Sequence, residues 1–167
     1  QGLVELEKLG IQRVLCHSEK AAAYMADGYA RAARRPGIAM AQSVGAANLA
    51  AGLQDPYLAL SPVIAFTGRR PLVQRGRHAY QEVDHLPLYD AVTKYNVSVD
   101  SPQQLAIQVR QAFREATSGA PGPVHLDLSG ISGDEVTEVD GDFEVVVEEP
   151  FRQIPPFRPE PEAERVR

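Results

Sequence analysis

The sequence predicts an α/β fold: a three-layer sandwich in which a mostly parallel sheet is flanked by helices. Short apolar runs alternate with segments of helical periodicity through residues 11–128, which is the pattern of strand–helix–strand units. One of these runs, residues 62–67, is continuously apolar up to its last residue, as expected of a central strand covered on both faces. Right-handed crossovers then place the helices on the two faces of the sheet.

The elements follow from local signals in chain order. Leu3, Leu6 and Leu9 predict the end of an amphipathic helix that stops at Gly10. Ser101 and Pro102 begin a long helix that presents Leu105, Val109, Ala112, Phe113 and Ala116 inward and ends before Gly119. The remaining predicted strands are residues 11–16, 38–41, 62–67, 94–99 and 123–128, the remaining helices are 19–33, 48–60 and 86–91, and residues 69–85 form a long polar loop.

The chain divides by composition into a domain at residues 1–129 and an extended Pro-rich exit segment at residues 130–167. Because the first helix lacks its start, we expect the sequence to be a fragment. The exit segment would then link to a following domain.

Composition excludes several classes of function. The chain has 167 residues and a net charge of −5 with scattered basic residues, which indicates no nucleic-acid partner. No apolar run is long enough to cross a membrane, and no zinc spacing or Walker loop occurs, so no metal ligands are predicted. One cysteine, Cys16, fits a reducing compartment, and its place at a predicted strand end favours a buried structural thiol. These features predict a soluble, cytoplasmic protein.

A carboxylate, Glu19, stands where the first predicted strand turns into a helix. Open α/β sheets place their ligand chemistry at such turns. A Glu in a first helical turn also complements the helix dipole, so its position alone leaves both interpretations open.

Several motifs in fixed order resemble the pyrimidine-binding (PYR) domain of thiamine-diphosphate enzymes of the acetolactate synthase and 2-keto-acid decarboxylase superfamily. The resemblance covers about residues 3–129. It departs from the family pattern at His17 and Ser18, and the glycine loop is one residue shorter, with Val44 at the position of a proline. The motifs are His-Ser-Glu at 17–19, Ala-Asp-Gly-Tyr-Ala-Arg at 26–31, Ser-Val-Gly-Ala-Ala-Asn at 43–48, Pro-Val-Ile-Ala-Phe-Thr-Gly at 62–68, Tyr-Gln-Glu-Val-Asp at 80–84, Thr-Lys-Tyr at 93–95 and Pro-Gly-Pro-Val-His-Leu at 121–126.

The resemblance implies roles for individual residues. Glu19 would be the catalytic carboxylate, which hydrogen-bonds N1′ of the aminopyrimidine ring and so activates the cofactor. Val44, Gly45 and Asn48 would line the pyrimidine site, although Asn48 alone is also explained as a helix cap. Gln81 would point into the substrate cavity, with a solvated loop position as the alternative. Independently of the resemblance, His78 on the same loop is a candidate acid/base group at the substrate, with simple exposure as the alternative.

Other polar residues have simpler interpretations. His125 lies on a predicted buried strand and is expected to be a hydrogen-bonded core residue. Arg69, Arg70, Arg75 and Arg77 are expected to form a solvated loop face, with an anionic substrate or acyl-CoA as the alternative.

The resemblance also implies partners. Thiamine diphosphate would be the cofactor, with its Mg²⁺ bound by a PP domain absent from this chain, so the chain alone is expected to be inactive. It would then be one domain of a longer polypeptide, with the exit segment leading toward a missing central domain, or one subunit of a split enzyme. FAD is possible but not indicated. The substrate would be pyruvate or a related 2-keto acid. A homodimer or dimer of dimers is expected, with helices 19–33 and 48–60 at the interface. The alternatives are a decarboxylase or aldehyde lyase of the same superfamily, and a catalytically silent binding or regulatory module of the same fold; an unrelated nucleotide-binding domain is disfavoured because no Gly-x-Gly-x-x-Gly turn occurs.

Overall fold

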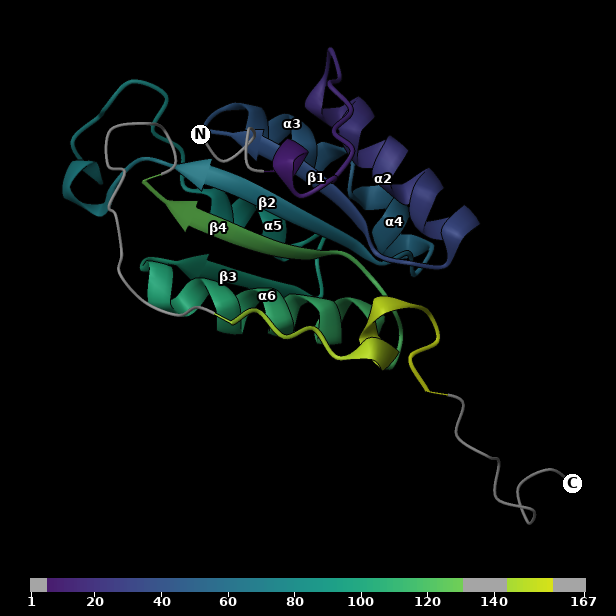
Figure 1. The fold of residues 1–167 in the computed structure, drawn as a ribbon. Helices are drawn as coiled ribbons and strands as arrows, with labels where there is room; N and C mark the ends of the chain where they lie inside the picture. Colours follow the sequence, from purple (N-terminus) through teal and green to yellow (C-terminus); the bar gives the residue numbers. More distant parts are fainter. Residues whose placement is uncertain (1–5, 131–143, 158–167) are drawn as a thin grey trace, which may run out of the picture.

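The computed structural model describes residues 6–130 and 144–157, and within them a four-stranded sheet lies between two layers of helices (Figure 1). The strands run in the order β1-β2-β4-β3, and all three neighbouring pairs are parallel. The strands are β1 (Gly37–Gln42), β2 (Val63–Arg69), β3 (Tyr95–Val99) and β4 (Val124–Ser129). The predicted α/β class and the buried central strand are confirmed.

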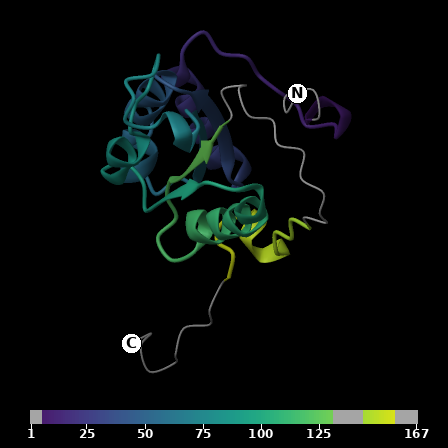
Figure 2. The same ribbon diagram turned by 90° about the vertical axis from the view of Figure 1, so that its left-hand side faces the viewer.

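The helices cover the two faces of the sheet unequally. Three of them, α2, α3 and α5, share one hydrophobic cluster with β1 and β2, whereas α6 packs with β2, β3 and β4. Both views show the sheet between α2 and α6 (Figures 1 and 2). The helices are α2 (Glu19–Ala33), α3 (Gly45–Ala51), α4 (Gln54–Leu58), α5 (His85–Asp90) and α6 (Pro102–Thr117), with short 3₁₀ turns at η1 (Leu72–Gln74) and η2 (Glu149–Arg152).

Alternation along β2 explains the two clusters. Val63 and Ala65 point to the side of α2 and α3, whereas Ile64 points to the side of α6, and all three side chains are fully buried. On α6 the residues Ala112 and Ala116 are buried as predicted. Leu105, which was also expected to face inward, is 38% exposed.

Residues 11–16 do not form the predicted strand. The segment is irregular and pairs with no strand among the described residues, and Ile11, Val14 and Leu15 are exposed. An apolar run becomes a strand only when a neighbouring strand satisfies its backbone hydrogen bonds, and composition carries no information on that neighbour. Cys16 at its end is half-buried against Met25 instead of fully buried (Sγ to Sδ, 3.4 Å).

The predicted helix over residues 48–60 is two helices, α3 and α4, separated at Gly52 and Leu53. Gly52 allows α3 to lie tightly against α2. A Cβ at this position would stand 2.6 Å from the Cβ of Ala23 and 2.8 Å from the carbonyl oxygen of Lys20. The close contact between the helices therefore depends on a residue without a side chain.

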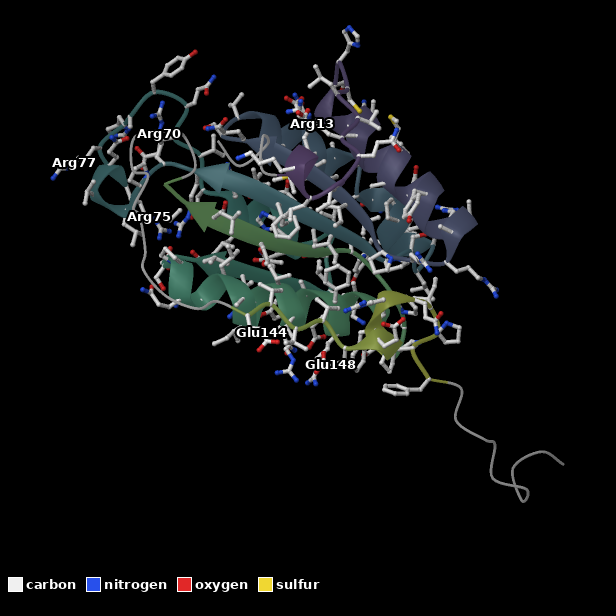
Figure 3. The ribbon with its side chains drawn as sticks, viewed as in Figure 1. Arg13, Arg70, Arg75, Arg77, Glu144 and Glu148 are labelled. Atoms are coloured by element: carbon white, nitrogen blue, oxygen red, sulfur yellow. The ribbon has the colours of Figure 1, made fainter. Side chains whose placement is uncertain are left out.

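Residues 144–157 lie along α6, where Glu148 pairs with Arg110 and Arg114 (Figure 3). Hydrogen bonds from these two guanidinium groups lower the pKa of the Glu148 carboxyl to about 2. Arg114 also stands over the ring of Phe151, with its guanidinium carbon 5.3 Å from the ring centroid. The predicted boundary at residues 129 and 130 adjoins residues 131–143, which lie outside the described residues, and it stays a prediction.

Candidate functional site

The carboxyl ends of β1 and β2 meet at one edge of the sheet, and the candidate site lies there. Two helices begin at this edge: α2 begins at Glu19, and α3 begins at Gly45. Glu19 is half-buried, and the side-chain amide of Asn48 donates a hydrogen bond to its Oε2 (3.2 Å). Asn48, which lies 29 residues further along the chain, thus holds the Glu19 carboxylate between the first turns of α2 and α3.

Gly45 lies directly against the carboxylate of Glu19. A Cβ at position 45 would stand 2.5 Å from Oε1 and 3.0 Å from Cδ of Glu19, closer than real side-chain contacts allow. The glycine of the Ser-Val-Gly-Ala-Ala-Asn motif therefore has a steric reason in this structure: it leaves the space that the Glu19 carboxylate fills.

Val44 and Asn48 complete this group of residues. Val44 is the N-cap residue of α3 and is 51% exposed, so it offers an apolar surface at the edge of the site. Asn48 is the fourth residue of α3, and its amide bonds Glu19. The structure thus brings together four of the residues predicted to act at the site, and it gives Asn48 a contact other than a helix cap.

Ser43, which begins the turn between β1 and α3, has a left-handed backbone conformation with φ of +50°. This conformation is disfavoured for residues other than glycine. Two side chains of α5 hydrogen-bond the main chain of this turn, residues 43–46. The ring of His85 donates from Nε2 to the Ser43 carbonyl oxygen (2.9 Å), and the Tyr89 hydroxyl donates to the Ala46 carbonyl oxygen (2.8 Å).

A buried polar layer lies under α5, between the helix and the sheet. Asp127 on β4 accepts from His85 Nδ1 (2.8 Å) and from the Thr67 hydroxyl (2.7 Å), and the guanidinium Nε of Arg69 stands 3.3 Å from its other oxygen. His125, fully buried, contacts Thr67 and, through Nδ1, Asn96 Oδ1 at 2.6 Å.

Burial sets the ionisation of two rings in this layer. Desolvation lowers the pKa of His125 to about 3, so this ring stays neutral near pH 7. Desolvation also raises the pKa of Tyr89, whose ring stacks on His125 with 3.5 Å between centroids. The prediction that His125 is a hydrogen-bonded core residue is confirmed.

Gln81 and His78 lie on the loop between β2 and α5. Both are exposed and have left-handed backbones, with φ of +59° and +55°. Gln81 lines a small cavity of about 40 Å³ together with Arg69, Arg70 and Arg75. In the part of the chain that the structure describes, no hydrogen bond joins either side chain to Glu19, and their substrate roles stay predictions.

The four arginines of this region differ in their exposure to solvent. Arg69 is only 8% exposed and pairs with Asp100 and Asp127, so the expectation of a solvated face is wrong for this residue. It is the last residue of β2 and points into the polar layer. Arg75 and Arg77 are exposed on the loop, whereas Arg70 is half-buried and donates from Nε to the Tyr80 carbonyl oxygen at 2.9 Å (Figure 3). Arg75 faces Asp84 at 3.7 Å.

Within residues 6–130 and 144–157, no three His, Cys, Asp or Glu side chains come together as ligands for a metal ion. Among the helices of those same residues, none has the length and apolar character that crossing a membrane requires.

Sequence reasoning missed the contribution of α5 and of the polar layer. One signal was present: Thr67 and Asp127 interrupt strands that are otherwise apolar, and they are register partners on β2 and β4. A polar residue inside a buried strand requires a partner. His85 and Tyr89 gave no such signal for their contacts with the turn of residues 43–46, because both bond main-chain carbonyl oxygens there, which every residue has.

The parallel α/β sandwich, with a carboxylate and a glycine packed together at its carboxyl edge, has the arrangement of doubly wound domains, which bind their ligands at that edge. The family described as "Thiamine pyrophosphate enzyme, N-terminal TPP binding domain" matches residues 2–88, which is more than half of the chain. The chain belongs to this family, which confirms the resemblance to the PYR domain; thiamine pyrophosphate is another name for thiamine diphosphate.

Similar curated proteins are acetolactate synthase subunits. A "Probable acetolactate synthase large subunit" of Methanocaldococcus jannaschii is 44% identical over 116 residues, which cover 69% of this chain and 20% of that protein. The "Acetolactate synthase isozyme 2 large subunit" of Escherichia coli is 43% identical over 120 residues, 71% of this chain and 22% of that protein. The mitochondrial catalytic subunit of Saccharomyces cerevisiae is 40% identical over 116 residues, 69% of this chain and 17% of that protein. The chain thus spans about a fifth of the length of these relatives.

Proposed function

We propose that the chain is the pyrimidine-binding domain of a thiamine-diphosphate-dependent, acetolactate synthase-like carboligase or decarboxylase that acts on pyruvate or a related 2-keto acid. The observation that carries this proposal is the Glu19 carboxylate, packed on Gly45 and held by Asn48 at the carboxyl edge of the sheet. Membership of the thiamine pyrophosphate enzyme family and similarity to acetolactate synthase large subunits support it.

The residues present fit the aminopyrimidine of thiamine diphosphate. The half-buried carboxylate of Glu19 would hold the proton at N1′ of the ring, and Asn48 fixes the orientation of that carboxylate. The exposed side chain of Val44 provides an apolar surface beside it for a flat ring. When bound, thiamine diphosphate supplies a carbon nucleophile at C2 of its thiazolium ring. The chain's own contribution is to bind and orient the pyrimidine and to hold a proton at N1′.

We propose that a PP domain, in the same polypeptide or in another chain, holds the diphosphate and its Mg²⁺. The cofactor needs both halves, so we expect no turnover from this chain alone. Gln81 and His78 on the loop are proposed to face the keto-acid substrate.

We further propose that the protein works as a homodimer or a dimer of dimers in the cytoplasm. Three large apolar side chains on one helix, Tyr24, Met25 and Tyr29 of α2, are 45–52% exposed in the single chain, which supports an interface through this helix. The single cysteine is consistent with a reducing compartment.

The central test is Glu19→Gln in the full-length protein. Glutamine keeps the shape and the Asn48 contact but cannot hold the proton at N1′, so we expect exchange of the cofactor C2 proton to fall by at least ~100-fold. Proton exchange is followed by NMR, and acetolactate formation from pyruvate is measured in parallel. The matched control is Glu115→Gln on α6, whose carboxylate accepts a hydrogen bond from Gln111.

Three outcomes decide between the alternatives. An exchange rate in Glu19→Gln within threefold of the wild type contradicts the assigned role. Release of an aldehyde without carbon–carbon bond formation identifies the decarboxylase or lyase alternative. Failure of the wild-type protein to bind thiamine diphosphate identifies a silent module of the same fold.

A further inference from the structure

We propose that His85 and Tyr89 of α5 are positioning residues that hold the turn of residues 43–46 in the shape that seats Gly45 against Glu19. This inference rests on the proposed function, because the turn matters only if Glu19 and its neighbours bind the pyrimidine. It adds a buried support beneath that site.

The turn needs external support because its backbone is strained. Ser43 holds a φ of +50° although it has a side chain, and it is 3% exposed. Its own amide donates to the Gly68 carbonyl oxygen (2.7 Å), which ties the turn to β2. The bond from His85 fixes the other side of the same residue.

The donors lie four residues apart on one face of α5 and are both fully buried. His85 reaches the Ser43 carbonyl and Tyr89 reaches the Ala46 carbonyl, one residue on each side of the pair Val44 and Gly45. The two contacts therefore bracket the residues predicted to line the pyrimidine site. A shift of α5 would move both ends of the turn together.

The position of His85 is itself fixed from the sheet. Its Nδ1 lies 2.8 Å from a carboxylate oxygen of Asp127, and its Nε2 lies 2.9 Å from the Ser43 carbonyl oxygen. Asp127 is 1% exposed and is bonded by Thr67 in turn. Charge-assisted hydrogen bonds of this kind are stronger and more directional than neutral ones.

Two substitutions of His85 separate positioning from general stability. In His85→Gln the terminal amide can replace Nε2–H and still donate to Ser43. In His85→Asn the shorter amide can replace only Nδ1–H, so the Ser43 carbonyl loses its donor. Tyr89→Phe removes a single hydroxyl and retains the ring stacked on His125. The matched control is Thr117→Val on α6, which also removes a fully buried hydroxyl bonded to a main-chain carbonyl, that of Phe113.

The first measurement is amide hydrogen exchange of a peptide covering residues 43–48 in the full-length protein without cofactor. We expect exchange at least tenfold faster in His85→Asn and Tyr89→Phe, and a rate within threefold of the wild type in His85→Gln and Thr117→Val. The second is thiamine-diphosphate affinity by titration calorimetry. We expect a tenfold weaker Kd in His85→Asn, equal to about 1.4 kcal/mol, and a Kd restored in His85→Gln.

Unchanged exchange at residues 43–48 in both His85→Asn and Tyr89→Phe would overturn the proposal. If His85→Asn does not fold, Tyr89→Phe alone decides it, because that variant keeps the aromatic core. The exchange measurement needs no cofactor. If the wild-type protein fails to bind thiamine diphosphate, the proposed function is refuted while the support of the turn by α5 is still tested.

Discussion

Replacing Gly45 by alanine tests the geometry of the site most directly. The added Cβ would stand 2.5 Å from Oε1 of Glu19, whereas ordinary contacts begin near 3.4 Å. The Glu19 carboxylate must therefore move away by about 1 Å. It moves more easily than the backbone of α3, because it is the end of a flexible side chain. Its hydrogen bond from Asn48, 3.2 Å long, is disturbed by the same movement.

The expected effect on chemistry is large and the expected effect on stability is small. A displacement of about 1 Å at a reacting group costs on the order of 100-fold in rate, or about 2.7 kcal/mol of activation free energy. The fold should lose less than about 1 kcal/mol, because alanine is a better helix former than glycine by a similar amount. Gly45→Ala should therefore exchange the cofactor C2 proton much more slowly than the wild type while its free energy of unfolding stays nearly the same.

The assay is exchange of the cofactor C2 proton in the full-length protein, with thermal unfolding of the same samples. A double-mutant cycle isolates the contact: in a Glu19→Ala background the carboxylate is gone, so Gly45→Ala should leave cofactor affinity unchanged. Wild-type exchange in Gly45→Ala would refute the steric argument. So would an affinity loss of equal size with and without the Glu19 carboxylate.

Three further predictions concern stability. Burial lowers the pKa of His125 from 6.5 in the unfolded chain to about 3 in the folded protein. The free energy of unfolding should therefore fall by about 2 kcal/mol from pH 7 to pH 5, as measured by urea unfolding. A His125→Gln variant should lack this part of the pH dependence. Gly52→Ala should destabilise the fold by about 1–3 kcal/mol in thermal or urea unfolding, because the new Cβ meets Ala23 at 2.6 Å; an unchanged midpoint would contradict this packing. Glu148→Gln should release residues 144–157 from Arg110 and speed proteolysis there, and the wild type should show the same loosening as the pH falls from about 4.5 toward 2; equal cleavage rates would count against it.

The sheet was predictable because its central strands carry their own signal. Residues 62–67 and 123–128 are apolar enough to require cover on both faces, and both are buried strands in the structure. The segment 11–16 has a similar composition and forms no strand. Strand formation depends on the neighbouring chain, which a local pattern does not encode.

The residues at the edge of the sheet were predictable for a different reason. Glu19, Gly45 and Asn48 belong to motifs, and the motifs are specific because one carboxylate must fit against one glycine. The support from α5 was not predictable. His85 lies 42 residues from Ser43 and bonds its main-chain carbonyl oxygen. A contact at this separation, to an atom that every residue has, produces no recognisable pattern in the sequence.

The polar layer under α5 restricts how the protein can evolve. Removing Asp127 alone would take the acceptor from two buried groups, His85 Nδ1 and the Thr67 hydroxyl, at a cost of about 1–3 kcal/mol for each group left unsatisfied. Replacing Arg69 or His85 alone would leave the buried Asp127 carboxylate with one partner fewer. Descendants of this sequence should therefore inherit Arg69, His85 and Asp127 together or exchange them as a set, so that common descent remains visible in a buried polar layer of the fold.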